Sequence, residues 1–277
     1  MAVPNEVDIR LRRVESRQNA LVKDLRKAFS HGQPTEQGFI AIEGLRILEE
    51  AIRSGLRFQA LFFSESARAQ AARLQPQVSS HTEMLLLPDN VFSSAVSTET
   101  PQGVAALVKP KPAKLDDLLE AVSDDFLLAG VGGIQDPGNL GTIIRSAEAF
   151  GARGVLLGEK TVSCWNAKAV RASAGSVFRE PLVRVALSEA IALLKQRRVR
   201  VVASSSHKGK PVQEVDLAGP LALLVGNEGA GLPPEVLSQA DDLARIPHSP
   251  RVESLNAGIA ASILLYEVAR QRQKPNH

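Results

Sequence analysis

Sulfur and long apolar runs are scarce in this chain, and their scarcity narrows its class. Only one cysteine, Cys164, occurs among 277 residues, which excludes an internal disulfide and favours a reducing compartment. No apolar run reaches the length of a membrane span, and the opening residues MAVPNEVDIRLRR lack the apolar core of a signal peptide. We therefore expect a soluble, cytoplasmic protein.

Aromatic residues make up only 4% of the chain, so its core must be built mainly from Ala, Leu, Val and Ile. The apolar fraction of 44% and the charged fraction of 23% are ordinary for a soluble globular protein. A chain of this length forms one large domain or two smaller ones, and we expect two.

Positive charge gathers near the start of the chain. The net charge is +3, and residues 1–115 hold 15 of the 33 Lys and Arg but 12 of the 30 Asp and Glu, which leaves 18 of each for the rest. A local basic surface suits a polyanion such as RNA, and the candidate RNA contacts are Arg10, Arg13, Arg17 and Lys23. A solvated helix face with i,i+4 ion pairs is an equally good interpretation.

Short apolar runs alternate with helical patterns in the first hundred residues. The spacing of apolar residues predicts helices over 14–30 and 45–55, the second closed by Gly55. Strands are predicted at 38–44, 58–65 and 84–88. This alternation predicts a small α/β domain with a largely parallel sheet.

Two prolines in the basic stretch LVKPKPAKLDD predict a linker, because proline removes a hydrogen-bond donor and stiffens an extended chain. We therefore expect an N-terminal domain over 1–108, a linker over 109–122 and a second domain over 123–277.

The second half repeats the strand–helix alternation on a larger scale. Five or so short Val/Leu runs with helices between them, among them DFLLAGV, RVRVVAS and LALLVG, predict a doubly wound α/β sheet that is covered on both faces. The last helix, expected from about residue 254, is apolar or small almost all round, so it should be buried in the core or against another subunit. Its small residues permit close backbone approach: Ala257, Gly258, Ala260, Ala261 and Ser262.

The stretch GVGGIQDPGNLGTIIRSAEAFG (130–151) has the outline of a nucleotide-binding turn. A P-loop is excluded, because the chain has no GxxxxGK[ST] string. A dinucleotide fingerprint is incomplete, since Gln135 stands where the third glycine belongs, although Glu159 occupies the place of a ribose-binding acid. An NAD-dependent oxidoreductase therefore stays an alternative on a partial match.

Three segments together give a fuller pattern: DPGNLGTIIR (136–145), LLVGNEGAGL (223–232) and ARIPHSPRVESLN (244–256). In order and spacing they resemble the three signature motifs of the SpoU-class, TrmH-like RNA ribose 2′-O-methyltransferases of the SPOUT superfamily. EGLRILEEAIRSG, LFFSE and STETPQGVAAL resemble the ribosomal-protein-like α/β substrate-binding domain that precedes the catalytic domain in many relatives. The two resemblances cover nearly the whole chain.

The resemblance implies a C-terminal SPOUT α/β domain with a deep trefoil knot and S-adenosyl-L-methionine as cofactor. It also implies a homodimer that methylates a ribose 2′-OH of structured RNA, with rRNA the first choice of substrate and tRNA the second. The residues that it assigns to the cofactor are Val225, Gly226, Ile246, Pro247 and Leu255. Turn chemistry alone is the other interpretation of the glycines at 226, 229 and 231.

The resemblance makes Arg145 the essential catalytic arginine, and Asn139, Glu228, Ser254 and Asn256 complete its polar constellation. Because a guanidinium stays protonated in proteins, our hypothesis is that Arg145 grips the phosphate beside the target ribose and orients the 2′-OH. From the residues alone, other roles stay open. Asn139 and Asn256 are candidate helix caps, Arg145 is a candidate partner of Glu148 at i+3, and Glu228 is a candidate cap of nearby amides.

The third motif departs from the family, which commonly has Met and Gly where this chain has His248 and Pro250. Pro250 stiffens the cofactor loop, and His248 is a candidate for titration near the reacting centre, although packing or RNA contact is favoured. No histidine shows metal-ligand spacing, so no metal is expected. An RNA-binding relative without catalysis is the remaining alternative beside the oxidoreductase.

Overall fold

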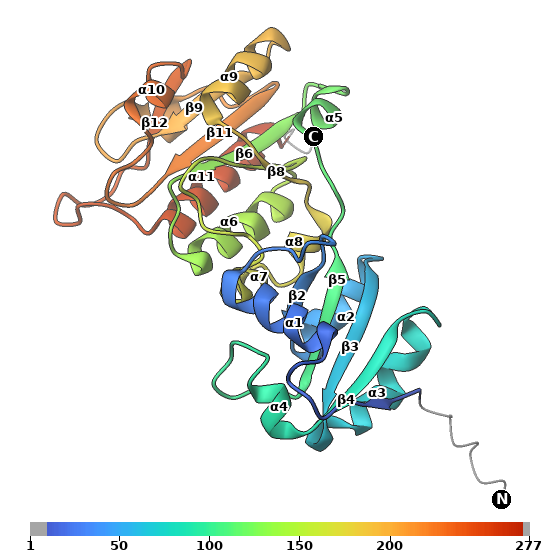
Figure 1. The fold of residues 1–277 in the computed structure, drawn as a ribbon. Coiled ribbons are helices and arrows are strands. Elements are labelled where there is room, and N and C mark those ends of the chain that lie inside the picture. Colours follow the sequence, from blue (N-terminus) through green and yellow to red (C-terminus); the bar gives the residue numbers. More distant parts are fainter. Residues whose placement is uncertain (1–9, 274–277) are drawn as a thin grey trace, which may run out of the picture. The chain divides into compact units, whose positions relative to one another are not determined.

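The computed structural model describes residues 10–273; residues 1–9 and 274–277, which begin and end the two predicted domains, lie outside the described residues. The chain forms two compact units (Figure 1). The N-terminal unit holds the described residues up to Lys111 together with Trp165–Val170, and the C-terminal unit holds Pro112–Cys164 and the chain from Arg171 onward. The division after Lys111 falls within the stretch predicted to be a linker.

The N-terminal unit is built on a five-stranded sheet of order β1-β4-β3-β5-β2. β4 is parallel to both β1 and β3, whereas β5 is antiparallel to both β3 and β2. The prediction of a largely parallel sheet is therefore wrong, because both antiparallel pairings involve β5, at which no strand was predicted. The strands are β1 (Arg12–Arg13), β2 (Ile40–Glu43), β3 (Arg57–Ser64), β4 (Glu83–Leu87) and β5 (Val104–Lys109).

The helices of this unit pack an apolar side onto the sheet. α1 (Ala20–His31) buries Val22, Leu25, Ala28 and Phe29, and it ends at Gly32 in the left-handed conformation. It begins later than the predicted helix over 14–30, because Asn19 caps its N-terminus by accepting a hydrogen bond from the Leu21 amide. The other helices are α2 (Leu45–Arg53), α3 (Ala69–Leu74) and α4 (Asp89–Ser93), with 3₁₀ turns η1 (Glu65–Ala67) and η2 (Gln75–Gln77).

The C-terminal unit contains a seven-stranded sheet of order β10-β12-β9-β11-β6-β7-β8 in which every neighbouring pair is parallel. The predicted doubly wound α/β sheet is confirmed. Its order reverses between β6 and β11, and at such a point the carboxyl ends of an open parallel sheet leave room for a ligand. The strands are β6 (Leu127–Gly132), β7 (Val155–Leu157), β8 (Leu182–Arg184), β9 (Arg200–Ser204), β10 (Lys210–Pro211), β11 (Leu221–Gly226) and β12 (Asp242–Arg245).

Helices cover this sheet on both faces (Figure 1). Apolar residues of α5, α9 and α10 form one core with alternate residues of the strands, such as Leu128, Val201, Ala203 and Leu224. α11 packs on β11 and on α6 over the other face. The helices of this unit are α5 (Leu115–Leu119), α6 (Pro137–Ala149), α8 (Ser176–Arg179), α9 (Leu187–Gln196), α10 (Pro234–Leu237) and α11 (Ala257–Arg272), with a 3₁₀ turn η3 (Val212–Glu214). A further helix, α7 (Ala167–Ala172), begins in the segment assigned to the N-terminal unit and ends in the C-terminal unit.

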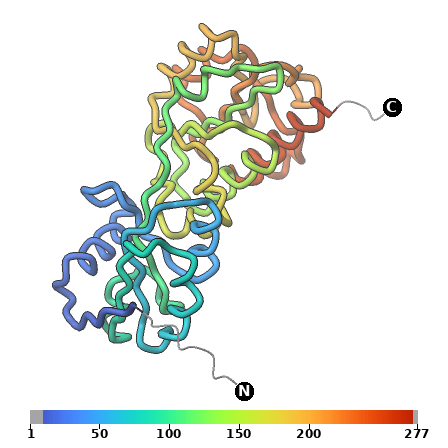
Figure 2. The backbone as a smooth tube through the Cα atoms, turned by 90° about the vertical axis from the view of Figure 1, so that its right-hand side faces the viewer, coloured from blue at the N-terminus to red at the C-terminus, as the bar shows by residue number. Residues whose placement is uncertain are grey.

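The last helix, α11, lies close against α6 (Figures 1 and 2). A Cβ atom at Gly258 would meet the Cβ of Thr142 at 3.2 Å, and the hydroxyls of Ser146 and Ser262 are 2.7 Å apart. The predicted close approach through small residues is thus confirmed. Burial is confirmed for only part of the helix, since one side remains exposed in a single chain: Ile259, Ile263 and Tyr266.

No helix among the described residues combines the length and the apolarity that a membrane span requires.

Candidate functional site

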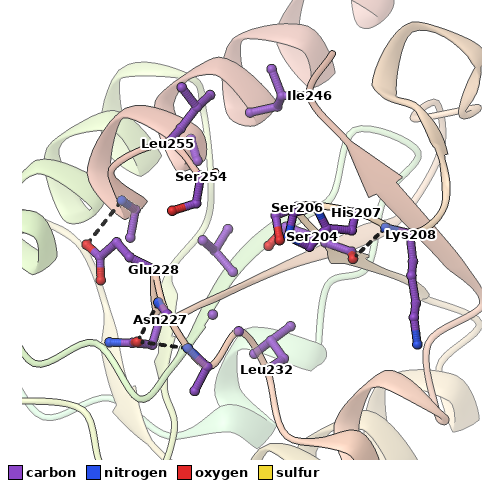
Figure 3. A pocket seen from close by; sticks show the side chains of 18 of the residues that line it. Ser204, Ser206, His207, Lys208, Asn227, Glu228, Leu232, Ile246, Ser254 and Leu255 are labelled. Carbon is purple, nitrogen blue, oxygen red and sulfur yellow. Dashed lines mark hydrogen bonds between the residues drawn. The ribbon is translucent and has the colours of Figure 1, made fainter. Parts of the chain in front are cut away.

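A pocket of about 470 Å³ lies at the carboxyl edge of the C-terminal sheet (Figure 3). Residues 204–208, after β9, and residues 225–232, at the end of β11 and after it, form two of its walls. Ile246 and His248, after β12, and residues 253–255, before α11, also line it. A cavity of this volume suits a small organic ligand.

The loop after β11 is folded tightly by its own residues. The Asn227 side chain accepts hydrogen bonds from the amides of Gly229 (2.9 Å) and Ala230 (3.2 Å), and its backbone pairs with Gly231. Gly231 adopts φ +66°, and a Cβ at Gly226 would lie 2.3 Å from the Gly231 carbonyl carbon. Turn chemistry therefore accounts for Gly226 and Gly231, and the same turn lets the main chain form a wall of the pocket.

Three of the predicted catalytic residues form one hydrogen-bonded cluster beside the pocket. The Asn139 side chain donates to Glu228, and Asn256 Nδ2 donates to Asn139 Oδ1 at 2.9 Å. Glu228 also accepts from the backbone amide of Ala257 at 3.2 Å (Figure 3). The cluster ties the starts of α6 and α11 to the loop after β11.

Of the three candidate helix caps, Asn256 and Glu228 cap α11, whereas Asn139 does not cap α6. Asn256 is the N-cap of α11, since its Oδ1 accepts from the Ile259 amide at 3.2 Å. Glu228 caps the same helix, because its carboxylate accepts a hydrogen bond from the Ala257 amide. Its alternative role as a cap of nearby amides is therefore confirmed. Asn139 is not a cap: Asp136 takes that position in α6 and accepts from the Asn139 amide at 2.9 Å. Proline at the first position of α6 explains the shift, because the cap must then be the residue before Pro137.

Arg145 projects from α6 and is exposed. Its side chain has no hydrogen bond or ion pair with any of residues 10–273. The expected partner Glu148 instead binds Arg179, with Nε–Oε1 and Nη2–Oε2 distances of 2.5 and 2.8 Å. The interpretation of Arg145 as half of a surface pair with Glu148 is therefore wrong. An unpaired guanidinium on a rigid helix can bind an external anion.

The remaining predicted residues of the site lie in or near the pocket. Val225, Gly226, Ile246 and Leu255 line it, as does Ser254, whereas Pro247 is exposed and does not. Figure 3 shows Ile246, Ser254 and Leu255 on one side of the pocket and Leu232 on the opposite side. Pro250 is also outside the lining, so the pocket exists without being narrowed by that ring.

His248 lines the pocket with a fixed orientation. Its Nδ1 lies 2.7 Å from the carbonyl oxygen of Ile246. A carbonyl only accepts, so Nδ1 carries the proton and Nε2 remains as the second ring nitrogen.

The predicted RNA contacts in the N-terminal unit are mostly engaged within that unit. Arg13 pairs with Glu15 (3.1 Å) and Glu65 (2.7 Å), and Arg17 donates to the Asn90 carbonyl at 3.3 Å. The Arg10 guanidinium donates to the Ser80 carbonyl. The Lys23 side chain has no ion pair or hydrogen bond with another described residue. Exposed pairs of this kind are weak, and such cations remain accessible to a polyanion.

Residues 204–208 were not identified from the sequence as part of the site. The segment SSSHK contains a lysine and a histidine, but no motif of the family includes it. The available signal was its place directly after a predicted strand, because the carboxyl ends of parallel strands meet at one edge. Using that signal required knowing that β9 neighbours β11, which the sequence does not state.

Two further features concern the oxidoreductase alternative and the question of a metal site. Glu159, the candidate ribose-binding acid, accepts from the Leu187 amide at 3.4 Å at the start of α9. Among residues 10–273, no three His, Cys, Asp or Glu side chains gather closely enough to hold a metal ion.

Comparisons with known proteins give the chain its class. The SpoU rRNA Methylase family model matches residues 127–266, and the MRM3-like substrate binding domain matches residues 19–106. The chain is 35% identical over 259 residues to the 23S rRNA (guanosine(2553)-2′-O)-methyltransferase RlmP of Bacillus subtilis (strain 168). That alignment covers 93% of this chain and 99% of the relative.

Two solved structures resemble both units. The AdoMet-bound rRNA methyltransferase from Sinorhizobium meliloti has a TM-score of 0.84 and 31% identity, and the match covers 96% of this chain and 100% of that one. The SpoU methyltransferase AviRb from Streptomyces viridochromogenes, in complex with AdoMet, has a TM-score of 0.81 and 30% identity, covering 92% and 98%.

The parallel sheet, the loop-built pocket at its carboxyl edge and these likenesses define an S-adenosylmethionine-dependent RNA ribose 2′-O-methyltransferase. The chain belongs to the SpoU rRNA methylase family. The predicted family, fold class, enzyme class and cofactor are confirmed.

The pocket fits this cofactor by its volume and its walls. The tight turn from Gly226 to Gly231 brings backbone amides and carbonyls to the cavity, where they can bind the edge of a purine. Ile246, Leu255 and Leu232 offer apolar surface for its flat faces. When bound there, S-adenosylmethionine supplies the methyl group of the reaction.

Proposed function

We propose that this enzyme methylates a ribose 2′-OH of ribosomal RNA, with Arg145 holding the phosphate next to the target ribose. One observation carries the assignment: Arg145 is unpaired and exposed on α6, whose start is tied by Asn139 to Glu228 in the wall of the pocket. The helix that presents the cation is thus fixed to the loop that holds the cofactor.

The chain's own residues supply alignment rather than a covalent step. Arg145 has two parallel N–H groups that match two phosphate oxygens, so it fixes the sugar beside that phosphate. The 2′-oxygen forms a bond to the methyl carbon as the carbon–sulfur bond breaks, and the hydroxyl proton leaves to the phosphate, to water or to a side chain. Asn139, Glu228 and Asn256 hold the starts of α6 and α11 against the loop after β11 for this alignment, and Ser254 lines the pocket beside them.

Ribosomal RNA is favoured as substrate by the relatives, since RlmP and the Sinorhizobium meliloti protein are both described as rRNA methyltransferases. Transfer RNA is the second choice, because several other relatives are described as tRNA/rRNA methyltransferases. We assign RNA capture to the N-terminal unit, with residues 19–106 matching a substrate-binding domain and with Arg10, Arg13, Arg17 and Lys23 as contacts.

We also propose a homodimer that works in the cytoplasm. The exposed side of α11 supports the dimer, because Ile259 and Tyr266 are 54% and 52% exposed on a helix that is otherwise packed. The trefoil knot implied by the resemblance remains a prediction; the convergence of the loops after β11 and β12 on one pocket supports it.

The experiment is transfer of labelled methyl from S-adenosylmethionine into unmodified rRNA and tRNA pools. We expect incorporation into rRNA by the wild type and a loss of at least about a hundredfold in Arg145→Lys, which keeps the charge but not the bidentate fork. An Arg145→Lys enzyme with near-wild-type turnover would contradict the phosphate clamp. No incorporation into either pool would support the non-catalytic RNA-binding alternative.

A further inference from the structure

One face of α6 carries a cation and an acid that are close enough to pair. Arg145 and Glu148 are separated by three positions, which on a helix places their Cβ atoms about 5–6 Å apart. Arg145 nevertheless makes no ion pair with any described residue. Another interaction of Glu148 must therefore replace the expected ion pair with Arg145.

Arg179, at the end of α8, binds the carboxylate of Glu148 in a bidentate ion pair. Its Nε and Nη2 bind the two carboxylate oxygens at 2.5 and 2.8 Å, and α8 packs against α6. The hydrogen bond from Arg179 is the main reason that the pKa of Glu148 lies below its ordinary value. The Arg179 side chain is 37% exposed and that of Glu148 28%, so this pair is shielded better than a freely exposed one.

A second carboxylate, that of Glu180, also interacts electrostatically with Arg179. Glu180 follows Arg179 directly, and its Oε2 is buried without a hydrogen-bond partner among residues 10–273. Burial, together with the charge of Glu148, raises the pKa of Glu180 to about 7, and Arg179 opposes that rise. Arg179 is therefore the cation that both acids share.

We propose that Arg179 is a positioning residue that keeps Arg145 available to RNA by holding Glu148 in a bidentate pair. This inference rests on the proposed phosphate-binding role of Arg145. Without Arg179, Glu148 lies within pairing distance of Arg145 at i,i+3 and competes with the RNA phosphate. The field of the acid also opposes the approach of RNA over the distance of a Debye length.

We expect the loss of Arg179 to weaken RNA binding moderately. An i,i+3 pair on an exposed helix is weak, and water and salt screen the added field. We expect Arg179→Gln to raise the KM for RNA about two- to fivefold at low salt, with less effect at high salt. The kcat and the affinity for S-adenosylmethionine should stay at the wild-type level, because neither residue lines the pocket.

The test is a double-mutant cycle with Arg179→Gln, Glu148→Gln and the two combined. Steady-state kinetics would vary the RNA, and calorimetry with S-adenosylmethionine would show that each variant is folded. We expect Glu148→Gln alone, and the double variant, to lie within about 1.5-fold of the wild-type KM. Arg179→Lys, which keeps the charge without the fork, should lie between the wild type and Arg179→Gln.

A double variant as impaired as Arg179→Gln would show that Arg179 acts through packing and would overturn the inference. A wild-type KM in Arg179→Gln would overturn it as well. Arg145→Ala separates the two proposals. If Arg145→Ala is inactive and Arg179→Gln is normal, only the inference fails; if Arg145→Ala has wild-type activity, the proposed role of Arg145 fails first.

Discussion

Gly226 and Gly229 lie in one loop, but only the first is confined by its surroundings. A Cβ at Gly226 would meet backbone atoms of Gly231 and Leu232 at 2.3 Å. At Gly229 the nearest atom is the Asn227 Oδ1, at an ordinary contact distance of 3.6 Å. The turn that forms the pocket wall therefore depends on one of the two glycines.

We predict that Gly226→Ala lowers the affinity for S-adenosylmethionine about tenfold or more, because backbone cannot yield as a flexible side chain does. Gly229→Ala is the matched control and should stay within about twofold of the wild type. Calorimetry with the cofactor measures both. A folded Gly226→Ala protein with wild-type affinity would show that this turn does not shape the cofactor site.

At the scale of elements, the packing of α8 on α6 brings two acids together. The pKa of Glu180 is about 7 in the fold against an ordinary 4.5, chiefly because the carboxyl is partly buried. A carboxyl with a raised pKa favours the fold while it is protonated. That contribution is complete below pH 4.5 and is lost as the pH rises through 7.

Glu180→Gln should therefore stabilise the protein at pH 8 and leave its stability at pH 4.5 nearly unchanged. A shift of this size corresponds to about 3 kcal/mol, but water reaches part of the side chain, so we expect about 1 kcal/mol. Urea unfolding of both proteins at the two pH values measures the difference. Equal stability of the two proteins at pH 8 would mean that Glu180 is solvated in the folded protein.

The elements of the C-terminal unit were largely predictable from the sequence. Continuous Val/Leu runs identified β6, β9 and β11, because strands buried on both faces need apolar residues throughout. The short elements β10, α8 and α10 were missed, since two to four residues carry no period. In the N-terminal unit β5 itself was missed, and its antiparallel pairing depends on distant contacts that the sequence does not state.

Site residues were predictable from the sequence where they belong to a recognisable local motif. Asn139, Arg145, Glu228 and Asn256 belong to motifs, and the structure brings Asn139, Glu228 and Asn256 into one cluster. The bond between Arg179 and Glu148 joins residues 31 positions apart, and no local pattern indicates it. The sequence therefore favoured the near partner of Glu148, which was Arg145.

At the scale of the whole molecule, the exposed side of α11 is the feature that a single chain does not explain. Ile259, Ile263 and Tyr266 follow one another at i, i+4 and i+7, which places them on one side of the helix. A twofold contact between two such surfaces would bury them in both copies.

We predict that Ile263→Asp converts a dimer of twice 29.7 kDa into a monomer of 29.7 kDa. Leu193→Asp is the control, since Leu193 on α9 is exposed to the same 38% as Ile263 but lies on a different helix. Light scattering after size exclusion gives both masses. A wild-type monomer, or a dimer that survives Ile263→Asp, would exclude this side of α11 as the interface.

The position of the transferred methyl group distinguishes ribose methylation guided by Arg145 from every other reaction considered above. After reaction with labelled S-adenosylmethionine, rRNA is digested to nucleosides and the labelled product is identified by mass spectrometry. We predict that the label resides in a 2′-O-methyl nucleoside from a single site in rRNA and that it is absent with Arg145→Lys. Label on a base, or the same 2′-O-methyl yield from Arg145→Lys, would contradict it.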